Sequence, residues 1–369
     1  MNILVTGAKG FVGRNLIAEL KNCGYQNIYE FDVDTPKEKL EEYTQNCNFV
    51  FHLAGVNRPE DPNEFMKGNY GFTLELLEKL KAHNNKSPIL LTSSIQAELD
   101  NPYGKSKKAG EDLLFQYSKE HNVEVYVYRL PNLFGKWSKP NYNSVVATFC
   151  YNIARDLEIK INNPESELTL CYIDDVLDEF KRALMNKPTK KGNYCYVPVT
   201  YNTTVGELAQ IIKSFKETRK NLDIPNMSNP FIKKLYSTYL SYLPEDKFSY
   251  ELKMNVDNRG SFTEFIRTLD RGQVSINIIK PGITKGNHWH HTKNEKFLVA
   301  YGEGVIRFRK IDYQEIIEYN VSGDKLEVVD IPSGYTHNIE NVGKTDMVVV
   351  MWANEPFDPE NPDTYYLEV

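Results

Sequence analysis

Hydrophobic positions follow two different periodic patterns along this chain. In the N-terminal part, short apolar runs alternate with longer stretches whose apolar residues recur every three or four positions. Such runs predict buried strands, and such stretches predict helices with one buried face. We expect strands at 2–5, 28–31, 48–53, 88–93 and 123–129, and helices at 11–20, 71–82 and 106–121. This alternation predicts an α/β fold with a Rossmann-like, doubly wound parallel sheet.

The hydrophobic pattern changes near residue 250. Beyond it, short apolar runs separated by turns replace the helical spacing. The runs lie at 274–279, 296–300, 305–308, 316–319, 326–329 and 347–351. They predict an all-β sandwich or barrel. Just before them, Phe231, Leu235, Tyr239 and Leu243 recur every four residues and predict a helix that joins the two parts. We therefore expect two domains, 1–246 and 250–369.

Length and composition agree with two globular domains. The 369 residues include 18 Phe, 24 Tyr and 3 Trp, which is too many aromatic residues for a disordered chain. The net charge of −6 gives no basic excess, so we expect no nucleic-acid partner. No apolar run is long enough for membrane insertion, the N-terminus lacks a signal-peptide pattern, and the five cysteines form no CxxC pair. We therefore expect a cytoplasmic protein.

Three glycines separate the first predicted strand from the first predicted helix, as Gly7-x-x-Gly10-x-x-Gly13. Glycines there permit a tight turn and let backbone amides approach a pyrophosphate at the positive end of the helix. Asp32, at the end of the second strand, suits the adenosine ribose of NADH, whereas Lys9 could attract the 2′-phosphate of NADPH. Both side chains could also be solvated surface charges. These residues predict a dinucleotide and leave the choice between NADH and NADPH open.

A second candidate site combines Tyr103 and Lys107, which lie four residues apart on one helical face, with Ser94 at the end of the preceding strand. A lysine ammonium beside a phenol lowers the phenol pKa. Such a tyrosine can transfer a proton to or from a substrate oxygen while hydride moves at the adjacent carbon. Ser94 could hold the same oxygen, with the neighbouring Ser93 as the alternative.

These motifs together resemble the extended short-chain dehydrogenase/reductase family over about the first 245 residues. The matching segments are TGAKGFVG (6–13), FHLAG (51–55), Asn69 in NYGFT, LTSS (91–94), YGKSK (103–107), RLPNLFG (129–135) and YIDDV (172–176). The resemblance implies that Ser94, Tyr103 and Lys107 are catalytic and that Asn132 helps to form a nucleotide-sugar pocket. It also implies that the cofactor is bound by Gly7, Lys9, Gly10, Phe11, Gly13, Asp32, Leu53, Ala54 and Lys107.

Two departures from the family pattern refine this expectation. Only eight residues separate Ser94 from Tyr103, which makes the serine assignment less secure than the tyrosine. Sugar-nucleotide dehydratases of the family carry an acidic residue next to the serine position, but Ile95 and Gln96 follow it here. The second departure favours a reductase or an epimerase over a dehydratase.

The third candidate site lies in the β-rich part, where four of the seven histidines fall within 288–337. His288 and His290 share one face of a strand, and Glu295 and His337 can reach that face from neighbouring strands. Three imidazoles and one carboxylate suit zinc, iron, manganese, nickel or copper. His291 points to the opposite face, so we do not expect it to be a ligand. A surface histidine cluster is the simpler alternative.

The spacing of these residues resembles both motifs of the cupin family over about residues 260–355, with Leu326 where a glycine is expected. The resemblance implies a jelly-roll domain with His288, His290, Glu295 and His337 as metal ligands, and zinc is the ion we expect. Cupins include oxygenases, isomerases, epimerases and proteins that only bind, so this likeness alone does not determine function.

The two domains in this order resemble bifunctional enzymes of bacterial capsular polysaccharide synthesis. That resemblance implies a UDP-linked 4-keto-6-deoxy-N-acetylhexosamine as substrate. The cupin domain would epimerise C3, and the reductase domain would reduce C4 with NADPH, giving UDP-2-acetamido-2,6-dideoxy-L-talose. A homodimer is expected, because such folds commonly pair. Two alternatives remain open: a single-activity reductase with a non-catalytic cupin, and a 4-epimerase that retains NAD.

Overall fold

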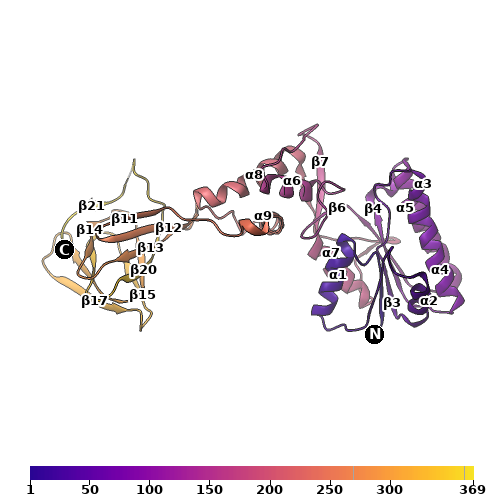
Figure 1. Cartoon of the computed structure of the whole chain (residues 1–369), viewed down its shortest axis with the longest axis horizontal. Helices are drawn as coiled ribbons and strands as arrows, with labels where there is room; N and C mark the ends of the chain where they lie inside the picture. Colours follow the sequence, from indigo (N-terminus) through magenta and orange to yellow (C-terminus); the bar gives the residue numbers. More distant parts are fainter. Residues whose placement is uncertain (269, 361) are drawn as a thin grey trace. The chain divides into compact units, whose positions relative to one another are not determined.

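The computed structural model describes residues 1–268, 270–360 and 362–369, and the chain forms two compact units (Figure 1). One unit comprises Met1–Lys213 and Pro230–Pro244, and the other comprises Ser214–Asn229 and Glu245–Val369. The boundary at 244/245 lies within the region where the hydrophobic rhythm changes. The segment Ser214–Asn229 groups with the C-terminal unit, which the sequence did not indicate.

The N-terminal unit is built on a seven-stranded sheet, confirming the predicted α/β fold. The strand order is β2-β1-β3-β4-β5-β9-β8, and all neighbours are parallel except β8 and β9. The strands are β1 (Ile3–Thr6), β2 (Ile28–Phe31), β3 (Phe49–His52), β4 (Ile89–Ser94), β5 (Val125–Leu130), β8 (Lys190–Lys191) and β9 (Tyr194–Cys195). Because the order reverses beside β1, the carboxyl ends of β1, β3 and β4 border the crevice where such sheets bind ligands.

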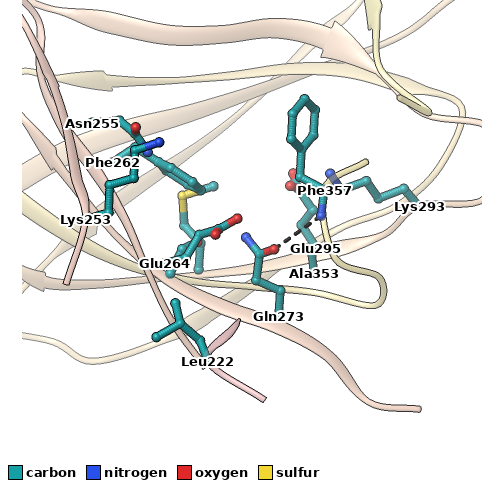
Figure 2. A pocket seen from close by; sticks show the side chains of 12 residues that line it. Leu222, Lys253, Asn255, Phe262, Glu264, Gln273, Lys293, Glu295, Ala353 and Phe357 are labelled. Atoms are coloured by element: carbon teal, nitrogen blue, oxygen red, sulfur yellow. Dashed lines mark hydrogen bonds between the residues drawn. The ribbon is translucent and has the colours of Figure 1, made fainter. Parts of the chain in front are cut away.

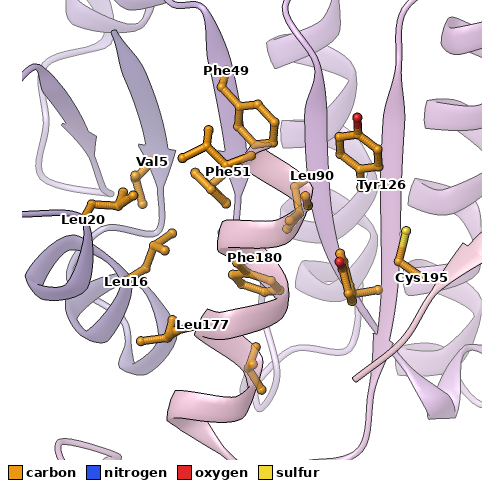
Figure 3. Close-up of a cluster of buried hydrophobic side chains, with 14 of the residues drawn as sticks. Val5, Leu16, Leu20, Phe49, Phe51, Leu90, Tyr126, Leu177, Phe180 and Cys195 are labelled. Carbon is orange, nitrogen blue, oxygen red and sulfur yellow. The ribbon is translucent and has the colours of Figure 1, made fainter. Parts of the chain in front are cut away.

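Helices cover both faces of this sheet (Figure 1). On one face, α1 (Phe11–Asn22) and α7 (Ile173–Leu184) pack on the sheet through a core that includes Leu16, Phe51 and Phe180 (Figure 3). On the other face, a second core contains residues of α2 (Lys37–Asn46), α4 (Phe72–Ala82) and α5 (Pro102–His121). Burial of these two apolar faces stabilises the sheet from both sides.

A smaller three-stranded sheet completes this unit, in the order β10-β7-β6. Its strands are β6 (Asn132–Phe134), β7 (Glu167–Tyr172) and β10 (Tyr201–Thr204), followed by α8 (Val205–Asn221). The predicted joining helix exists as α9 (Pro230–Leu240), but it does not join the two units. It contacts α6 (Val145–Ala154) within the N-terminal unit, and its Leu235 and Tyr239 are buried.

The C-terminal unit contains two antiparallel sheets, which confirms the predicted all-β architecture. One has the order β11-β12-β13-β20-β15-β18 and the other β17-β16-β19-β14-β21. A core that includes Phe297, Ile306, Ile339 and Val349 contains residues of both sheets. The strands are β11 (Met254–Asp257), β12 (Gly260–Thr268), β13 (Gly272–Ile279), β14 (Thr284–Trp289), β15 (Glu295–Tyr301), β16 (Glu303–Lys310), β17 (Ile316–Ser322), β18 (Val328–Ile331), β19 (Tyr335–Asn341), β20 (Met347–Ala353) and β21 (Tyr365–Tyr366).

Among the described residues, no helix has both the length and the hydrophobicity that crossing a membrane requires.

Candidate active site and metal centre

The glycine turn between β1 and α1 is shaped by close backbone contacts. Gly7 has a φ of +68°, and a Cβ there would lie 2.8 Å from the backbone nitrogen of Ala54. A Cβ on Gly13 would lie 2.2 Å from the carbonyl oxygen of Gly7. Gly10 caps α1, which starts at Phe11 and has no side-chain cap. The turn therefore brings an uncapped helix N-terminus beside the end of β3, a geometry that suits a pyrophosphate.

The Asp32 carboxylate meets the backbone of Lys9 beside this turn, and the Lys9 side chain takes no part in that contact. The Lys9 backbone N–H donates to Asp32 Oδ2 at 2.7 Å, and the Val33 N–H donates to Asp32 Oδ1 at 2.8 Å. The Lys9 ammonium instead forms an ion pair with Asp34. Asp32 thus connects the glycine turn to the end of β2, and the selection between NADH and NADPH stays a prediction.

The structure separates the two candidate serines at the end of β4. The Ser94 side chain lies close enough to the Tyr103 phenol to exert a lowering effect on its pKa, and Ser94 Oγ accepts from the Gln96 N–H at 3.2 Å. Ser93 Oγ donates to the buried Glu111 carboxylate at 2.5 Å. Ser93 is thus engaged by Glu111 further along α5, and Ser94 is the serine that lies beside Tyr103.

The short spacing between serine and tyrosine has a structural explanation. After β4 the chain makes a 3₁₀ turn over Ile95–Glu98, and α5 then begins at Pro102, earlier than the predicted residue 106. Asn101 caps the helix by accepting from the Gly104 N–H at 2.8 Å. Tyr103 therefore lies in the first turn of α5, close to the end of β4.

Burial sets the protonation of both Tyr103 and Lys107. Phe65 packs on the Tyr103 ring with centroids 5.6 Å apart, and burial raises the Tyr103 pKa, while the Ser94 hydrogen bond opposes this rise. Burial lowers the pKa of Lys107 to about 8, and its Nζ donates to the carbonyl oxygen of Thr92 at 2.7 Å. The predicted lowering of the Tyr103 pKa by Lys107 is therefore wrong, because desolvation dominates. A protonated phenol suits proton donation to a ketone oxygen.

Asn69 is a site residue to which the sequence assigned no role. It lies in a π-helical turn, Met66–Gly71, and such turns occur frequently at functional sites. Its side chain exchanges hydrogen bonds with the backbone of Val56 (2.9 and 3.0 Å) and donates to Ser106 Oγ at 2.9 Å. A Cβ on Gly55 would lie 2.9 Å from Asn69 Oδ1 and 3.4 Å from Lys107 Nζ. Asn69 thus fixes the loop after β3 beside Lys107.

In the C-terminal unit, His288, His290, Glu295 and His337 converge as predicted. One ligand atom from each lies within 4.8 Å of the others. His288 pairs directly with His337 across β14 and β19, next to an irregularity between Gly286 and His288. His291 is exposed and lies outside the cluster.

The hydrogen bonds of this cluster leave its inner atoms free for a cation. His290 Nδ1 bonds the Asp363 carbonyl oxygen, and His337 Nδ1 lies 3.5 Å from that of Tyr335. Within the described part of the chain, His290 Nε2, His337 Nε2 and Glu295 Oε2 are buried without a hydrogen-bond partner. Burying such atoms unpaired is costly.

The protonation states of His288 and Glu295 also suit metal binding. Burial lowers the pKa of His288 to about 4, so this imidazole is neutral near pH 7. Burial opposes ionisation of Glu295, but the facing His290 and His337 outweigh it and lower the Glu295 pKa below its ordinary value. The neutral imidazole of His288 and the ionised carboxylate of Glu295 are forms that bind a divalent ion, so these residues fit a metal.

A cavity of about 260 Å³ lies over the cluster, and a second of about 380 Å³ adjoins it. The two share Phe262, Lys293, Glu295, Met351 and Phe357 in their walls. In the second cavity, the side chains of Glu264 and Gln273 point inward (Figure 2). The candidate metal centre is thus open to a molecule larger than an ion.

Two family models match the chain. Residues 3–197 match the NAD dependent epimerase/dehydratase family, and residues 255–365 match the polysaccharide biosynthesis C-terminal domain. A curated relative, UDP-2-acetamido-2,6-beta-L-arabino-hexul-4-ose reductase of Pseudomonas aeruginosa, is 48% identical over 100% of this chain and 99% of its own.

Solved structures extend the likeness to the whole fold. The capsular polysaccharide assembling protein CapF of Staphylococcus aureus is 59% identical, with a TM-score of 0.95 and 100% of both chains covered. UDP-glucose 4-epimerase of Thermotoga maritima is 23% identical with a TM-score of 0.53, covers 66% of this chain and 98% of its own, and shares the fold alone. The chain belongs to the NAD dependent epimerase/dehydratase family, in the two-domain group that includes CapF.

Proposed function

We propose that this chain is a bifunctional nucleotide-sugar enzyme of bacterial capsular polysaccharide synthesis. Its substrate is a UDP-linked 4-keto-6-deoxy-N-acetylhexosamine. The C-terminal unit epimerises C3, and the N-terminal unit then reduces C4 with NADPH to give UDP-2-acetamido-2,6-dideoxy-L-talose. The observation that carries this proposal is that one chain holds two chemically different centres, a Ser94–Tyr103–Lys107 group and a buried His/Glu cluster. The names of the Pseudomonas reductase and of CapF support the substrate class and the pathway.

In the reductase centre, Tyr103 provides the proton for the C4 oxygen. Burial keeps its phenol protonated, and the neighbouring Ser94 hydroxyl orients the phenol. Lys107 places a positive charge near the end of β4, where charge develops on the ketone oxygen. The nicotinamide cofactor supplies the hydride for C4 when bound. Hydride on carbon and a proton on oxygen together convert the ketone into an alcohol.

The cofactor is held at the start of α1. The turn from Gly7 to Gly13 suits the pyrophosphate, and Leu53 and Ala54 border it from the end of β3. We propose NADPH on the strength of the family resemblance, since Asp32 by itself favours NADH. A comparison of initial rates with the two cofactors tests this choice, and equal or faster use of NADH contradicts it.

In the C-terminal unit, His288, His290, Glu295 and His337 would hold a divalent ion, which we expect to be zinc. A bound ion acts as a Lewis acid towards a ketone oxygen. The 4-keto group makes the C3 hydrogen acidic, so removing the proton and returning it to the other face inverts C3. Lys285 and Lys293 line the same cavity and place positive charge where the sugar becomes anionic. Reduction at C4 then removes the ketone and prevents further exchange at C3.

An assay with the full chain tests the reductase half directly. The metal-loaded protein is mixed with the UDP-4-keto sugar and NADPH, and the loss of reduced nicotinamide is followed together with C4 by NMR. We expect one NADPH oxidised per C4 alcohol formed. The Tyr103→Phe variant should lose about 100-fold to 10,000-fold in rate, the usual contribution of a positioned proton donor.

Two other outcomes favour the alternative functions. Interconversion of C4 epimers without net NADPH consumption, in a protein that purifies with NAD, indicates a 4-epimerase. Unchanged reduction of a substrate that already has the inverted C3, with no C3 chemistry on the original substrate, leaves a single-activity reductase. We also propose a homodimer, and a light-scattering mass near the chain mass of 42.7 kDa would contradict it.

A further inference from the structure

The end of the chain lies against the strand that carries two of the histidines. Tyr365 and Tyr366 pair with Trp289 and His288 as β21 on β14. The Leu367 N–H donates to the Asn287 carbonyl oxygen at 3.0 Å. Strand β21, within the segment 362–369, is thus the edge strand beside β14 in the sheet that carries His288 and His337.

Asp363 makes the densest set of contacts in this segment. Its carboxylate accepts hydrogen bonds from three successive backbone N–H groups, those of His291 (2.9 Å), Thr292 (2.8 Å) and Lys293 (2.8 Å). The Thr292 hydroxyl donates to the same carboxylate at 3.1 Å. The Asp363 carboxylate therefore holds the loop that joins β14 to β15, between His290 and Glu295.

The backbone carbonyl of Asp363 contacts His290 itself, at Nδ1. A carbonyl oxygen can only accept a hydrogen bond, so Nδ1 must carry the hydrogen. In the neutral imidazole, Nε2 then bears the free electron pair, and this atom faces Glu295 at 3.6 Å. One residue thus fixes both the tautomer of His290 and the loop that follows it.

We propose that Asp363 is a positioning residue of the metal centre, one that holds His290 so that Nε2 is ready to bind a divalent ion. This inference rests on the proposed metal site. Carbonyl or carboxylate partners of metal-binding histidines typically contribute about 10-fold to 100-fold to metal affinity. The Asp363 carboxylate acts indirectly: by binding the loop 291–293, it keeps the backbone carbonyl of Asp363 in position beside His290.

Three variants of the full chain separate this role from general stability. Asp363→Ala removes the carboxylate, whereas Asp363→Asn keeps one oxygen acceptor but turns an NH₂ donor towards a backbone N–H. Glu368→Gln is the matched control, because it makes the same carboxylate-to-amide change in the same segment. Among the described residues, the Glu368 side chain accepts a hydrogen bond from the Tyr366 hydroxyl at 2.9 Å. Thermal unfolding in the presence of a chelator checks that each variant folds without metal.

The measurements are the Zn²⁺ dissociation constant, from competition with a coloured chelator, and the visible spectrum of the Co²⁺-loaded protein. We expect the Zn²⁺ dissociation constant to rise about 10-fold to 100-fold for Asp363→Ala, with a smaller rise for Asp363→Asn and none for Glu368→Gln. The Co²⁺ spectrum should change in the same order, because the orientation of His290 changes. If Asp363→Ala does not fold, the comparison of the Zn²⁺ dissociation constants of Asp363→Asn and Glu368→Gln tests the proposal instead.

Two results would overturn the proposal, and they differ from each other. Wild-type affinity and an unchanged Co²⁺ spectrum in both Asp363 variants would show that the Asp363 carboxylate does not position His290, while leaving the metal centre intact. Failure of the wild-type protein to bind Zn²⁺ or Co²⁺ would remove the metal centre itself, and the role of Asp363 with it.

Discussion

Two adjacent serines at the end of β4 allow catalysis and stability to be perturbed separately. Ser94 lies beside the Tyr103 phenol, whereas Ser93 donates a hydrogen bond to Glu111 in α5. We expect Ser94→Ala to lower kcat with a smaller loss of stability than Ser93→Ala. We expect Ser93→Ala to lower the free energy of unfolding with little loss of kcat in the protein that remains folded.

The sizes of both effects follow from the partners. Ser93 donates at 2.5 Å to the fully buried Glu111, which also receives Arg129 at 2.7 and 2.9 Å. A hydrogen bond to a charged group contributes about 1.5–3 kcal/mol, so Ser93→Ala should cost about that much stability. Ser94 assists an atom that gains charge during proton transfer, so an equal energy would appear as about a 10-fold to 100-fold fall in kcat. Ser94→Ala also removes the hydroxyl that caps the 3₁₀ turn by accepting from the Gln96 N–H, which should lower the free energy of unfolding by about 1 kcal/mol.

The assay compares both variants with the wild type in urea unfolding and in initial rates of NADPH oxidation. Measuring kcat and KM separately shows whether Ser94→Ala affects the chemical step. The reasoning is refuted if Ser93→Ala lowers kcat more than Ser94→Ala while unfolding like the wild type. That result would make Ser93 the residue that acts beside Tyr103.

Three further predictions concern the N-terminal unit. Burial lowers the pKa of Lys107 from 10.5 to about 8. Between pH 8 and 10.5, Lys107 is therefore protonated in the unfolded chain but largely neutral in the folded protein, so its contribution makes the free energy of unfolding rise with pH. Lys107→Met should therefore be more stable than wild type at pH 7, by up to about 3 kcal/mol, and the difference should shrink towards pH 10 in urea unfolding. Gly13→Ala should abolish cofactor binding measured by calorimetry, because its Cβ would lie 2.2 Å from a backbone oxygen; normal binding contradicts the close approach. Asp34→Ala releases the Lys9 ammonium, so the ratio of NADPH to NADH rates should rise, and an unchanged ratio would show that Lys9 does not contact the 2′-phosphate.

The pattern of hydrophobic positions alone located most of the elements that form the cores of the two units. Strand β2 has the predicted bounds of 28–31, and the first helix was misplaced by only two residues at its end. These segments bury apolar side chains with regular spacing, so the pattern and the packing agree. Helix α2 was missed because its described buried residues are only Leu40 and Thr44, too few to produce a visible apolar face.

Strand β14 is absent from the strands that hydrophobicity predicts, although the spacing of His288 and His290 already indicated a strand there. Its residues, TKGNHW, carry histidine where a structural strand would place an apolar side chain. Its residues are exposed or half-buried, and the half-buried His288 faces the candidate metal centre instead of an apolar core, so no apolar periodicity marks this strand. The ligands were still predictable, because residue type and spacing indicate a metal site independently of hydrophobicity.

Contacts between distant residues could not be predicted from the sequence. Asp363 lies 73 residues from His290, and no local pattern connects them. Likewise, both Ser93 and Ser94 are compatible with the motif until Glu111 in α5 is seen to bond one of them. The direction of the Tyr103 pKa also depends on packing, because Phe65 and its surroundings exclude water from the phenol.

The central claim is that two centres in one chain catalyse two separate reactions. The most direct test incubates the metal-loaded chain with the UDP-4-keto sugar in D₂O, without NADPH, and follows deuterium at C3 by NMR. The account predicts deuterium at C3 with the wild type and with Tyr103→Phe, and none above the enzyme-free rate with His290→Ala. Absence of deuterium with the wild type, or its persistence in His290→Ala, would contradict the account.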